Sequence, residues 1–352
     1  MNELTSEFSI LIIDNDTIQT FYNNLENNNH LDIIIIQRDI FDKLKLNLKE
    51  IEILFNKLYE KNIKIIFDID DDLLNIDKTH VSYDRFSKIE KTLKIILKNS
   101  DIVTVSTENL KTQLVNLNEN TTIVPNTLLK LFDFNPNTKI KNLNNKKTIK
   151  IGYFGTRTHG NDVKLIENAI YNVKKVFNNK NIILEVVGVC SENHEWIKKI
   201  NMPNNYKNNP TYKDYLKNFV SNFLSRLNLM YNSLPYINFI NWMQNEMDWD
   251  IAVAPLEDTN INRSKSNLKY LEYTALNIPG VYSNIGPYKE IGEKNTGIVV
   301  NNTPEEWEKA LINLIEDNEL YETILKNAHE DVEKNYLVKN SSTIWKDILD
   351  EF

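Results

Sequence analysis

The sequence predicts an α/β fold with two successive domains, each containing a parallel sheet covered by helices. Short apolar runs alternate with longer segments of helical periodicity, which is typical of β-α-β units. The apolar runs contain few polar residues, as expected for strands that are buried on both faces. A polar, aperiodic stretch at residues 131–148 interrupts this pattern, and the 352 residues are enough for two cores.

The first predicted domain spans residues 1–130. Its expected strands are residues 8–13, 32–37, 64–67, 101–105 and 122–124. Helical periodicity occurs between them at residues 41–61, 80–98 and 107–117. Residues 131–148 are rich in Asn and Lys and lack periodicity, so we expect them to form a linker.

The second predicted domain spans residues 149–335. Its expected strands are residues 149–154, 182–189, 236–239, 250–254, 281–283 and 297–300. Helices are expected at residues 162–178, 265–277, 303–316 and 318–335, with a mostly helical insertion at residues 191–234. We expect residues 336–352 to form a helix that returns to the first domain.

Composition excludes several classes of protein. The formal net charge of -8 argues against a nucleic-acid-binding protein, which usually carries a basic patch. A single cysteine excludes an internal disulfide and fits a cytoplasmic location. The N-terminal residues lack the pattern of a signal peptide, and the longest apolar runs are too short to span a bilayer. Peripheral association with the inner face of a membrane stays compatible with this composition.

Residues 262–284 (NRSKSNLKYLEYTALNIPGVYSN) form the most informative segment. In the helix predicted there, Lys265, Lys269 and Glu272 are four and three residues apart, so they share one face. A helix N-terminus and nearby lysines suit a diphosphate, because unpaired N–H groups and positive charge stabilise its oxygens. Glu272 is suited to accept hydrogen bonds from ribose hydroxyls. A solvated helix face with a Lys–Glu pair is the alternative interpretation.

Residues 151–165 (IGYFGTRTHGNDVKL) form a second candidate segment. A predicted strand runs into a glycine-containing loop, and a helix follows near Asp162. Open α/β domains bind ligands at the carboxyl ends of their strands, which is where this loop belongs. Asp162 is a candidate either for capping the helix or for binding a ligand, and His159 for ligand contact or loop structure.

Both segments resemble the retaining GT-B glycosyltransferases of group 1, the family four-like enzymes. Residues 272–279 match their pattern Glu-(aromatic or Ala)-x-Ala-x-x-x-Pro. Residues 265–273 resemble the Lys-Ser-x-x-Lys-x-x-Glu-Tyr donor helix of a bacterial subgroup. That subgroup also has Gly-x-x-Thr-His-x-x-Asp, matched by Gly155, Thr158, His159 and Asp162. The resemblance implies a GT-B fold, in which two Rossmann-like domains with parallel sheets face a cleft.

The resemblance also implies an activity. A sugar would pass from a nucleotide diphosphate sugar to a hydroxyl of a glycan, lipid-linked glycan or glycoprotein, with retention and without a metal or other cofactor. Arg157 and Lys269 are the implied catalytic residues on the donor side. The implied donor-binding residues are Gly155, Thr156, His159, Lys265, Ser266, Asn267, Leu268 and Glu272. Many relatives have a second Glu where this chain has Ser264, which leaves the donor sugar open.

Residues 65–74 (IIFDIDDDLL) place four aspartates at the end of a predicted strand. The family subgroup carries a similar run on the acceptor side, which makes Asp68 and Asp70 candidates to orient an acceptor hydroxyl. A Mg-dependent phosphatase of the haloacid dehalogenase type is an alternative, although Asp72 occupies the position of its expected Thr. A metal-binding Asp-x-Asp of a GT-A transferase would require a single domain. Alternatively, the aspartates only cap the next turn.

Further alternatives concern the whole chain and its aromatic residues. Periplasmic binding proteins and some dehydrogenases share the two-domain plan, and a nucleotide-sugar-binding protein without catalysis also fits it. Tyr236 and Trp242 are candidates to stack on a nucleobase, with core packing as the alternative. For Trp249 we expect core packing.

Overall fold

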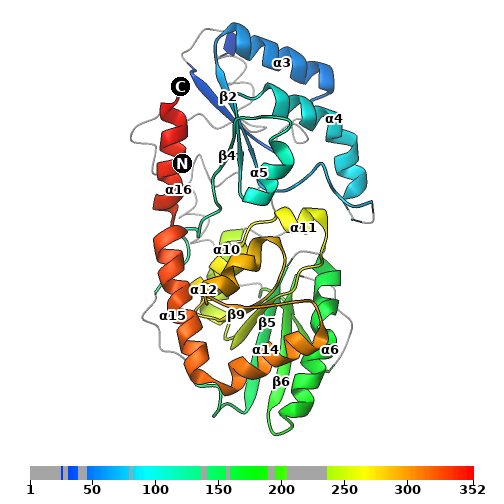
Figure 1. The fold of residues 1–352 in the computed structure, drawn as a ribbon, viewed down its shortest axis with the longest axis vertical. Helices are drawn as coiled ribbons and strands as arrows, with labels where there is room; N and C mark the ends of the chain where they lie inside the picture. The colour runs from blue at the N-terminus through cyan, green and yellow to red at the C-terminus, as the bar shows by residue number, and fades with distance from the viewer. Residues whose placement is uncertain are drawn as a thin grey trace. The chain divides into compact units, whose positions relative to one another are not determined.

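The computed structural model describes residues 25–26, 31–38, 46–78, 80, 82–135, 141–155, 159–188, 195–203 and 236–352. The chain divides into two compact units (Figure 1). Unit 1 comprises Met1–Asn126, Thr259–Ser266 and Lys339–Phe352, and unit 2 comprises Thr127–Asp258 and Asn267–Val338. The short segment Thr259–Ser266 therefore belongs to unit 1, although unit 2 residues flank it on both sides in the sequence.

The described strands of unit 1 form a parallel sheet in the order β1-β2-β3-β4. The strands are β1 (Ile33–Gln37), β2 (Lys64–Ile69), β3 (Ile102–Val105) and β4 (Thr121–Ile123). The helices are α3 (Leu48–Glu60), α4 (Tyr83–Asn99), α5 (Glu108–Leu114), α11 (Asn260–Ser264) and α16 (Val338–Asp350). The strand expected at residues 8–13 lies outside the described residues.

Alternation along β2 explains how the unit 1 sheet is covered. Ile65 and Phe67 belong to the cluster formed with α3, α4 and α5, whereas Ile66 packs with Ile348 and Leu349 of α16. Successive side chains of a strand point to opposite faces, so β2 is apolar on both sides. Helix α3 begins at Leu48, where Asn47 and Glu50 form a capping box. Residues 41–45 of the segment predicted as helical lie outside the described residues.

Unit 2 contains a six-stranded parallel sheet in the order β10-β9-β8-β5-β6-β7. The strands are β5 (Thr148–Phe154), β6 (Asn181–Val187), β7 (Ile197–Ile200), β8 (Ile251–Ala254), β9 (Gly280–Ser283) and β10 (Ile298–Val300). The helices are α6 (Gly160–Val176), α10 (Tyr236–Glu246), α12 (Leu268–Ala275), the 3-10 helix η2 (Gly286–Tyr288), α13 (Lys289–Glu293), α14 (Pro304–Glu316) and α15 (Asn318–Asn335).

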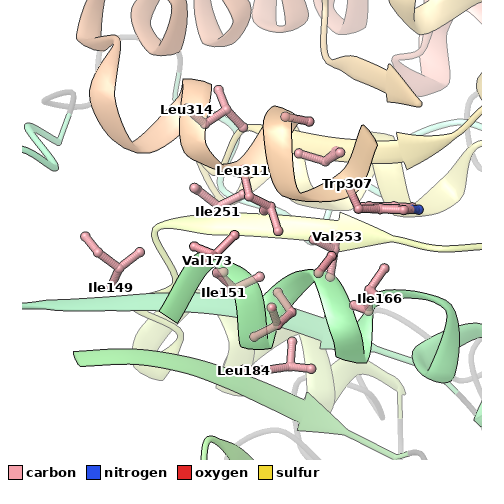
Figure 2. Packing of buried hydrophobic residues seen from close by; sticks show 14 of the residues in the cluster. Ile149, Ile151, Ile166, Val173, Leu184, Ile251, Val253, Trp307, Leu311 and Leu314 are labelled. Carbon is pink, nitrogen blue, oxygen red and sulfur yellow. The ribbon is translucent and has the colours of Figure 1, made fainter. Parts of the chain in front are cut away.

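Helices cover both faces of the unit 2 sheet. Figure 2 shows residues of α6 and α14, such as Val173 and Leu311, packed with Ile151 of β5 and Val253 of β8. A second cluster contains residues of α10, α12 and α15 together with Phe154, Trp249 and Ala252. Trp249 is fully buried, as expected, and its indole Nε1–H donates to Glu185 Oε2 at 3.0 Å.

Two predictions for unit 2 are wrong. Residues 236–239, predicted as a strand, belong to α10, because the spacing of the buried Ile240 and Met243 suits a helix that packs on the core. The strand β7 lies within a region predicted to be mostly helical. Lys198 and Lys199 are exposed on this edge strand, so its sequence (IKKI) lacks the apolar signature of the central strands.

Candidate functional site

β5 ends in the glycine-containing loop that the sequence predicts to bind a ligand. The Gly155 N–H donates to the Val187 carbonyl oxygen at 3.0 Å, which holds the turn against β6. A Cβ at Gly155 would lie 2.8 Å from the Tyr153 hydroxyl, and one at Gly188 would lie 2.3 Å from the Gly155 carbonyl oxygen. Both positions therefore require glycine. The predicted ligand residues Thr156 and Arg157 lie outside the described residues.

Asp162 connects the start of α6 to the loop after β8. Its Oδ2 lies 2.6 Å from His159 Nδ1, and its Oδ1 accepts a hydrogen bond from the Glu257 N–H at 2.7 Å. The carboxylate is buried. His159 is the N-cap residue of α6, and its side chain makes no capping hydrogen bond. Asp162 holds the His159 ring and the loop after β8 through these two contacts.

The predicted helix over residues 265–277 is also wrong, because the chain forms two short helices there. α11 ends at Ser264, and α12 begins at Leu268. Lys265 has an extended backbone (ψ 159°), and Ser266 Oγ accepts a hydrogen bond from Asn126 Nδ2 at 2.8 Å. Serine and asparagine compete with helical hydrogen bonding in this way. Lys265 therefore does not share a helical face with Lys269 and Glu272.

Helix α12 keeps Lys269 and Glu272 one turn apart. The Lys269 ammonium lies 5.4 Å from the centre of the Tyr153 ring, in the range of a cation–π contact. Glu272 is 5% exposed, and its negative charge contributes to raising the pKa of Tyr288, after burial and Asp162. The Asn267 side chain does not cap the helix, and Leu268 is 39% exposed.

Ser264, where many relatives of the resembled family have Glu, is part of unit 1. Its carbonyl oxygen accepts a hydrogen bond from Thr107 Oγ1 at 2.9 Å, and its Oγ lies 2.8 Å from Asn109 Nδ2. The side chain is fully buried, and Ile261 of the same helix packs into the unit 1 core. A glutamate at this position would be a buried charge at the start of α5.

We expect Ser264→Ala to lower the free energy of unfolding by about 1 kcal/mol, because Asn109 loses its acceptor. Urea denaturation followed by circular dichroism measures the change. Ser87→Ala is the control, since Ser87 is exposed on α4, and it should change stability by less than about 0.5 kcal/mol. Equal stabilities of the two variants would contradict the packing described for Ser264.

The four aspartates at the carboxyl end of β2 have different surroundings. Asp68 Oδ1 accepts a hydrogen bond from Thr104 Oγ1 at 2.8 Å, and burial raises its pKa. Asp70 forms an ion pair of 2.7 Å with Arg38, which also pairs with Asp71. Asp72 is 1% exposed and accepts hydrogen bonds from the backbone and side chain of Asn75, so it caps the following turn.

Asp70 has the most unusual titration of this group. Burial raises its pKa to about 6, with smaller contributions from the negative charges of Asp71 and Asp68, although Arg38 acts in the opposite direction. Its side chain is still 42% exposed. A carboxylate that is reachable and that titrates near neutrality is suited to exchange protons with a hydroxyl.

Three residues that contact the predicted site residues of their own unit were missed from the sequence. Arg38 directly follows β1, as Asp70 and Asp71 follow β2, and polar residues at the ends of adjacent parallel strands are a signal that could have identified it. The pKa of His80 is lowered by burial and by the charge of Lys265, so these two side chains of unit 1 are neighbours. Tyr153 was missed because an aromatic residue in a buried strand usually indicates core packing.

The described part of the chain shows neither an arranged metal site nor a helix that could span a membrane. There, no group of three or more His, Cys, Asp or Glu side chains is arranged to hold a metal ion. Within the same residues, no helix is both long enough and apolar enough to cross a bilayer.

Comparisons with known proteins give structural matches. No family model matches the sequence, and no curated protein matches it. A glycosyltransferase from Rickettsia africae superposes with a TM-score of 0.55 at 15% identity, over 99% of this chain and 86% of that one. Anabaena Alr3699/HepE in complex with UDP and glucose gives a TM-score of 0.56 at 13% identity, over 94% and 81%.

The fold is GT-B. A third match is S. aureus TarM in complex with fondaparinux, alpha-GlcNAc-glycerol and UDP, with a TM-score of 0.53 at 17% identity. It covers 83% of this chain, which spans only 52% of the length of TarM. Two Rossmann-like units in one chain, each with a parallel sheet, agree with the fold predicted from the sequence.

Proposed function

We propose that this protein is a glycosyltransferase. It transfers a sugar from a nucleotide diphosphate sugar to a hydroxyl of a glycan, lipid-linked glycan or glycoprotein, with retention. The observation that carries the proposal lies in unit 2, where the tightly packed Gly155 turn and Lys269 of α12 both contact Tyr153. The shared fold of glycosyltransferases that bind UDP supports it.

The donor-side roles follow from charge and position. Lys269 and Arg157 neutralise the diphosphate as it leaves, which is where negative charge develops in the transition state. Glu272 accepts hydrogen bonds from the ribose hydroxyls, and Gly155, Thr156 and His159 contact the phosphates. Lys265, Ser266, Asn267 and Leu268 complete the donor-binding segment. In this scheme the cationic side chains stabilise the leaving group, and the reaction needs no metal ion.

The acceptor-side roles belong to the carboxylates of unit 1. Asp70 is the residue that receives the proton of the acceptor hydroxyl, because its side chain is partly exposed and its pKa is about 6. Asp68 is held by Thr104 and supports the position of Asp70 through the shared end of β2. Arg38 keeps the ionised form of Asp70 accessible at neutral pH.

The test is a calorimetric panel of UDP, GDP, dTDP and CMP, followed by transfer assays with the sugar nucleotide of the base that binds. We expect saturable binding of one nucleoside diphosphate and transfer that persists in EDTA. Complete loss of activity in EDTA would contradict the metal-free mechanism. Binding without turnover on any acceptor would favour a nucleotide-sugar-binding protein. Phosphate release that Asp68→Asn abolishes would favour the phosphatase.

We expect transfer activity to fall as the pH drops through about 6, because Asp70 is then protonated and no longer a base. Asp70→Asn should remove this inflection and lower kcat by about 100-fold.

The protein should stay folded over the same range of pH. The pKa of Asp70 is raised in the folded protein from 3.8, so its contribution to stability is greatest at low pH and falls as the pH rises to about 6.

The pH profile is measured as kcat and kcat/KM between pH 5 and 8, with circular dichroism at each pH. Asp84→Asn is a matched control, since Asp84 is exposed in the first turn of α4. An unchanged inflection in Asp70→Asn would assign the titration to another group.

A further inference from the structure

Tyr153 has a buried hydroxyl that the fold leaves without a hydrogen bond. Its side chain is fully buried in the cluster that contains Ile151 and Val163. Among the residues that the structure describes, no atom forms a hydrogen bond with the Tyr153 hydroxyl. An unpaired buried hydroxyl lowers stability, and a phenylalanine would fill the same space without that penalty. Packing alone therefore does not explain a tyrosine at this position.

The hydroxyl lies directly beneath the Gly155 turn. The position of a Cβ at Gly155 is 2.8 Å from the phenol oxygen, so glycine leaves room for it there. The charge of Asp162 and burial both raise the pKa of Tyr153, burial more strongly, so the phenol stays protonated and can donate. Gly155 opens the loop to which the proposed function assigns the phosphate contacts.

The same ring also contacts the second proposed phosphate-binding element. The Lys269 ammonium lies 5.4 Å from the centre of the Tyr153 ring, and a ring face attracts a cation without neutralising it. The contact with the ring therefore fixes the position of the Lys269 ammonium. One side chain thus joins the Gly155 turn to α12.

We propose that Tyr153 is a positioning residue of the donor site. Its ring holds the Lys269 ammonium where a nucleotide diphosphate binds, and its hydroxyl gains a hydrogen-bond partner only when that diphosphate is bound. This inference rests on the proposed function, because it takes the Gly155 turn and Lys269 as the donor's phosphate site. A phenylalanine at position 153 would keep the ring contact with Lys269 and lose the hydrogen bond to the diphosphate.

The decisive variant is Tyr153→Phe, compared by calorimetry with the wild type for the nucleoside diphosphate that binds best among UDP, GDP and dTDP. We expect its dissociation constant to rise by about tenfold, as for the loss of one hydrogen bond to a charged group. The melting temperature of the ligand-free variant should equal or exceed that of the wild type. A Tyr153→Leu variant, which also loses the ring, should bind more weakly still.

Tyr273→Phe provides a matched control. Tyr273 is also fully buried, and it follows Glu272 on α12, but its hydroxyl donates to the Val253 carbonyl oxygen at 3.0 Å. We expect the opposite result for it, a lower melting temperature with unchanged nucleotide affinity. Comparing the two variants therefore distinguishes a hydroxyl that stabilises the fold from a hydroxyl that binds the ligand.

The outcomes distinguish this inference from the proposed function. If the wild type binds a nucleoside diphosphate and Tyr153→Phe binds it equally well, the role of the hydroxyl is refuted and the proposed function stands. Lys269→Ala is also introduced into the Tyr153→Leu variant. If it weakens nucleotide binding there by the same factor as in the wild-type protein, the ring does not position the lysine. If the wild type binds none of the three nucleotides, the proposed function fails and this inference fails with it.

Discussion

Lys269→Ala should lower kcat/KM for sugar transfer by about 100- to 1,000-fold, because the leaving diphosphate loses a cation in the transition state. Glu272→Ala should mainly raise KM, because hydrogen bonds to the ribose are made equally in the ground and transition states. Initial rates at varied donor concentration separate the two effects. The decrease for Lys269→Ala should lie largely in kcat.

Lys164→Ala is the control for the loss of a positive charge, since Lys164 is exposed on α6 of the same unit. It should keep the wild-type kcat/KM within about twofold. If Lys269→Ala and Glu272→Ala both transfer sugar as well as the wild type, the donor site does not include α12.

Gly152→Ala should be the most destabilising single substitution considered for unit 2. A Cβ at Gly152 would lie 1.7 Å from Trp249 Cδ2 and 2.0 Å from its Cε3. The indole cannot move aside easily, because it is fully buried, stacked on Phe154 and hydrogen-bonded to Glu185. We expect a loss of about 4 kcal/mol, beyond the usual cost of overpacking.

Gly292→Ala provides the comparison for this substitution. Its Cβ would lie 3.1 Å from the Val299 Cβ, and it would replace a glycine within α13. The gain in helix propensity should offset the tight contact and leave stability within about 1 kcal/mol of the wild type. Guanidinium denaturation measures both variants. Similar midpoints for the two would show that Trp249 is not held as described.

The strands and the aspartate run were predictable because their signals are local. β2 contains a continuous apolar run at residues 65–67 with Asp68 directly after it, so the sequence predicts both the buried strand and the polar residues at its end. β5 and its glycine turn were predicted for the same reason. Parallel topology follows from the alternation of strands and helices, and the structure has parallel pairing throughout its described sheets.

The break between α11 and α12 was not predictable, because its cause is distant in the sequence. Ser264 and Ser266 are held by Asn109 and Asn126, about 150 residues earlier in the chain. Local spacing of Lys265, Lys269 and Glu272 favours one helix, and tertiary hydrogen bonds override it. The Arg38–Asp70 pair likewise joins the ends of two strands, and no spacing within one segment indicates it.

The membership of Thr259–Ser266 in unit 1 determines how this protein can be divided. The chain passes from one unit to the other at residues 126–127, 258–259, 266–267 and 338–339. No single cut yields two complete halves. A fragment ending at Asn126 would lack Ile261 from its core and Ser264 from its hydrogen bonds, and residues 127–338 alone would carry α11 without those partners. Unit 1 is therefore assembled from three separate segments of the chain, and the sequence of unit 2 must be present to connect them.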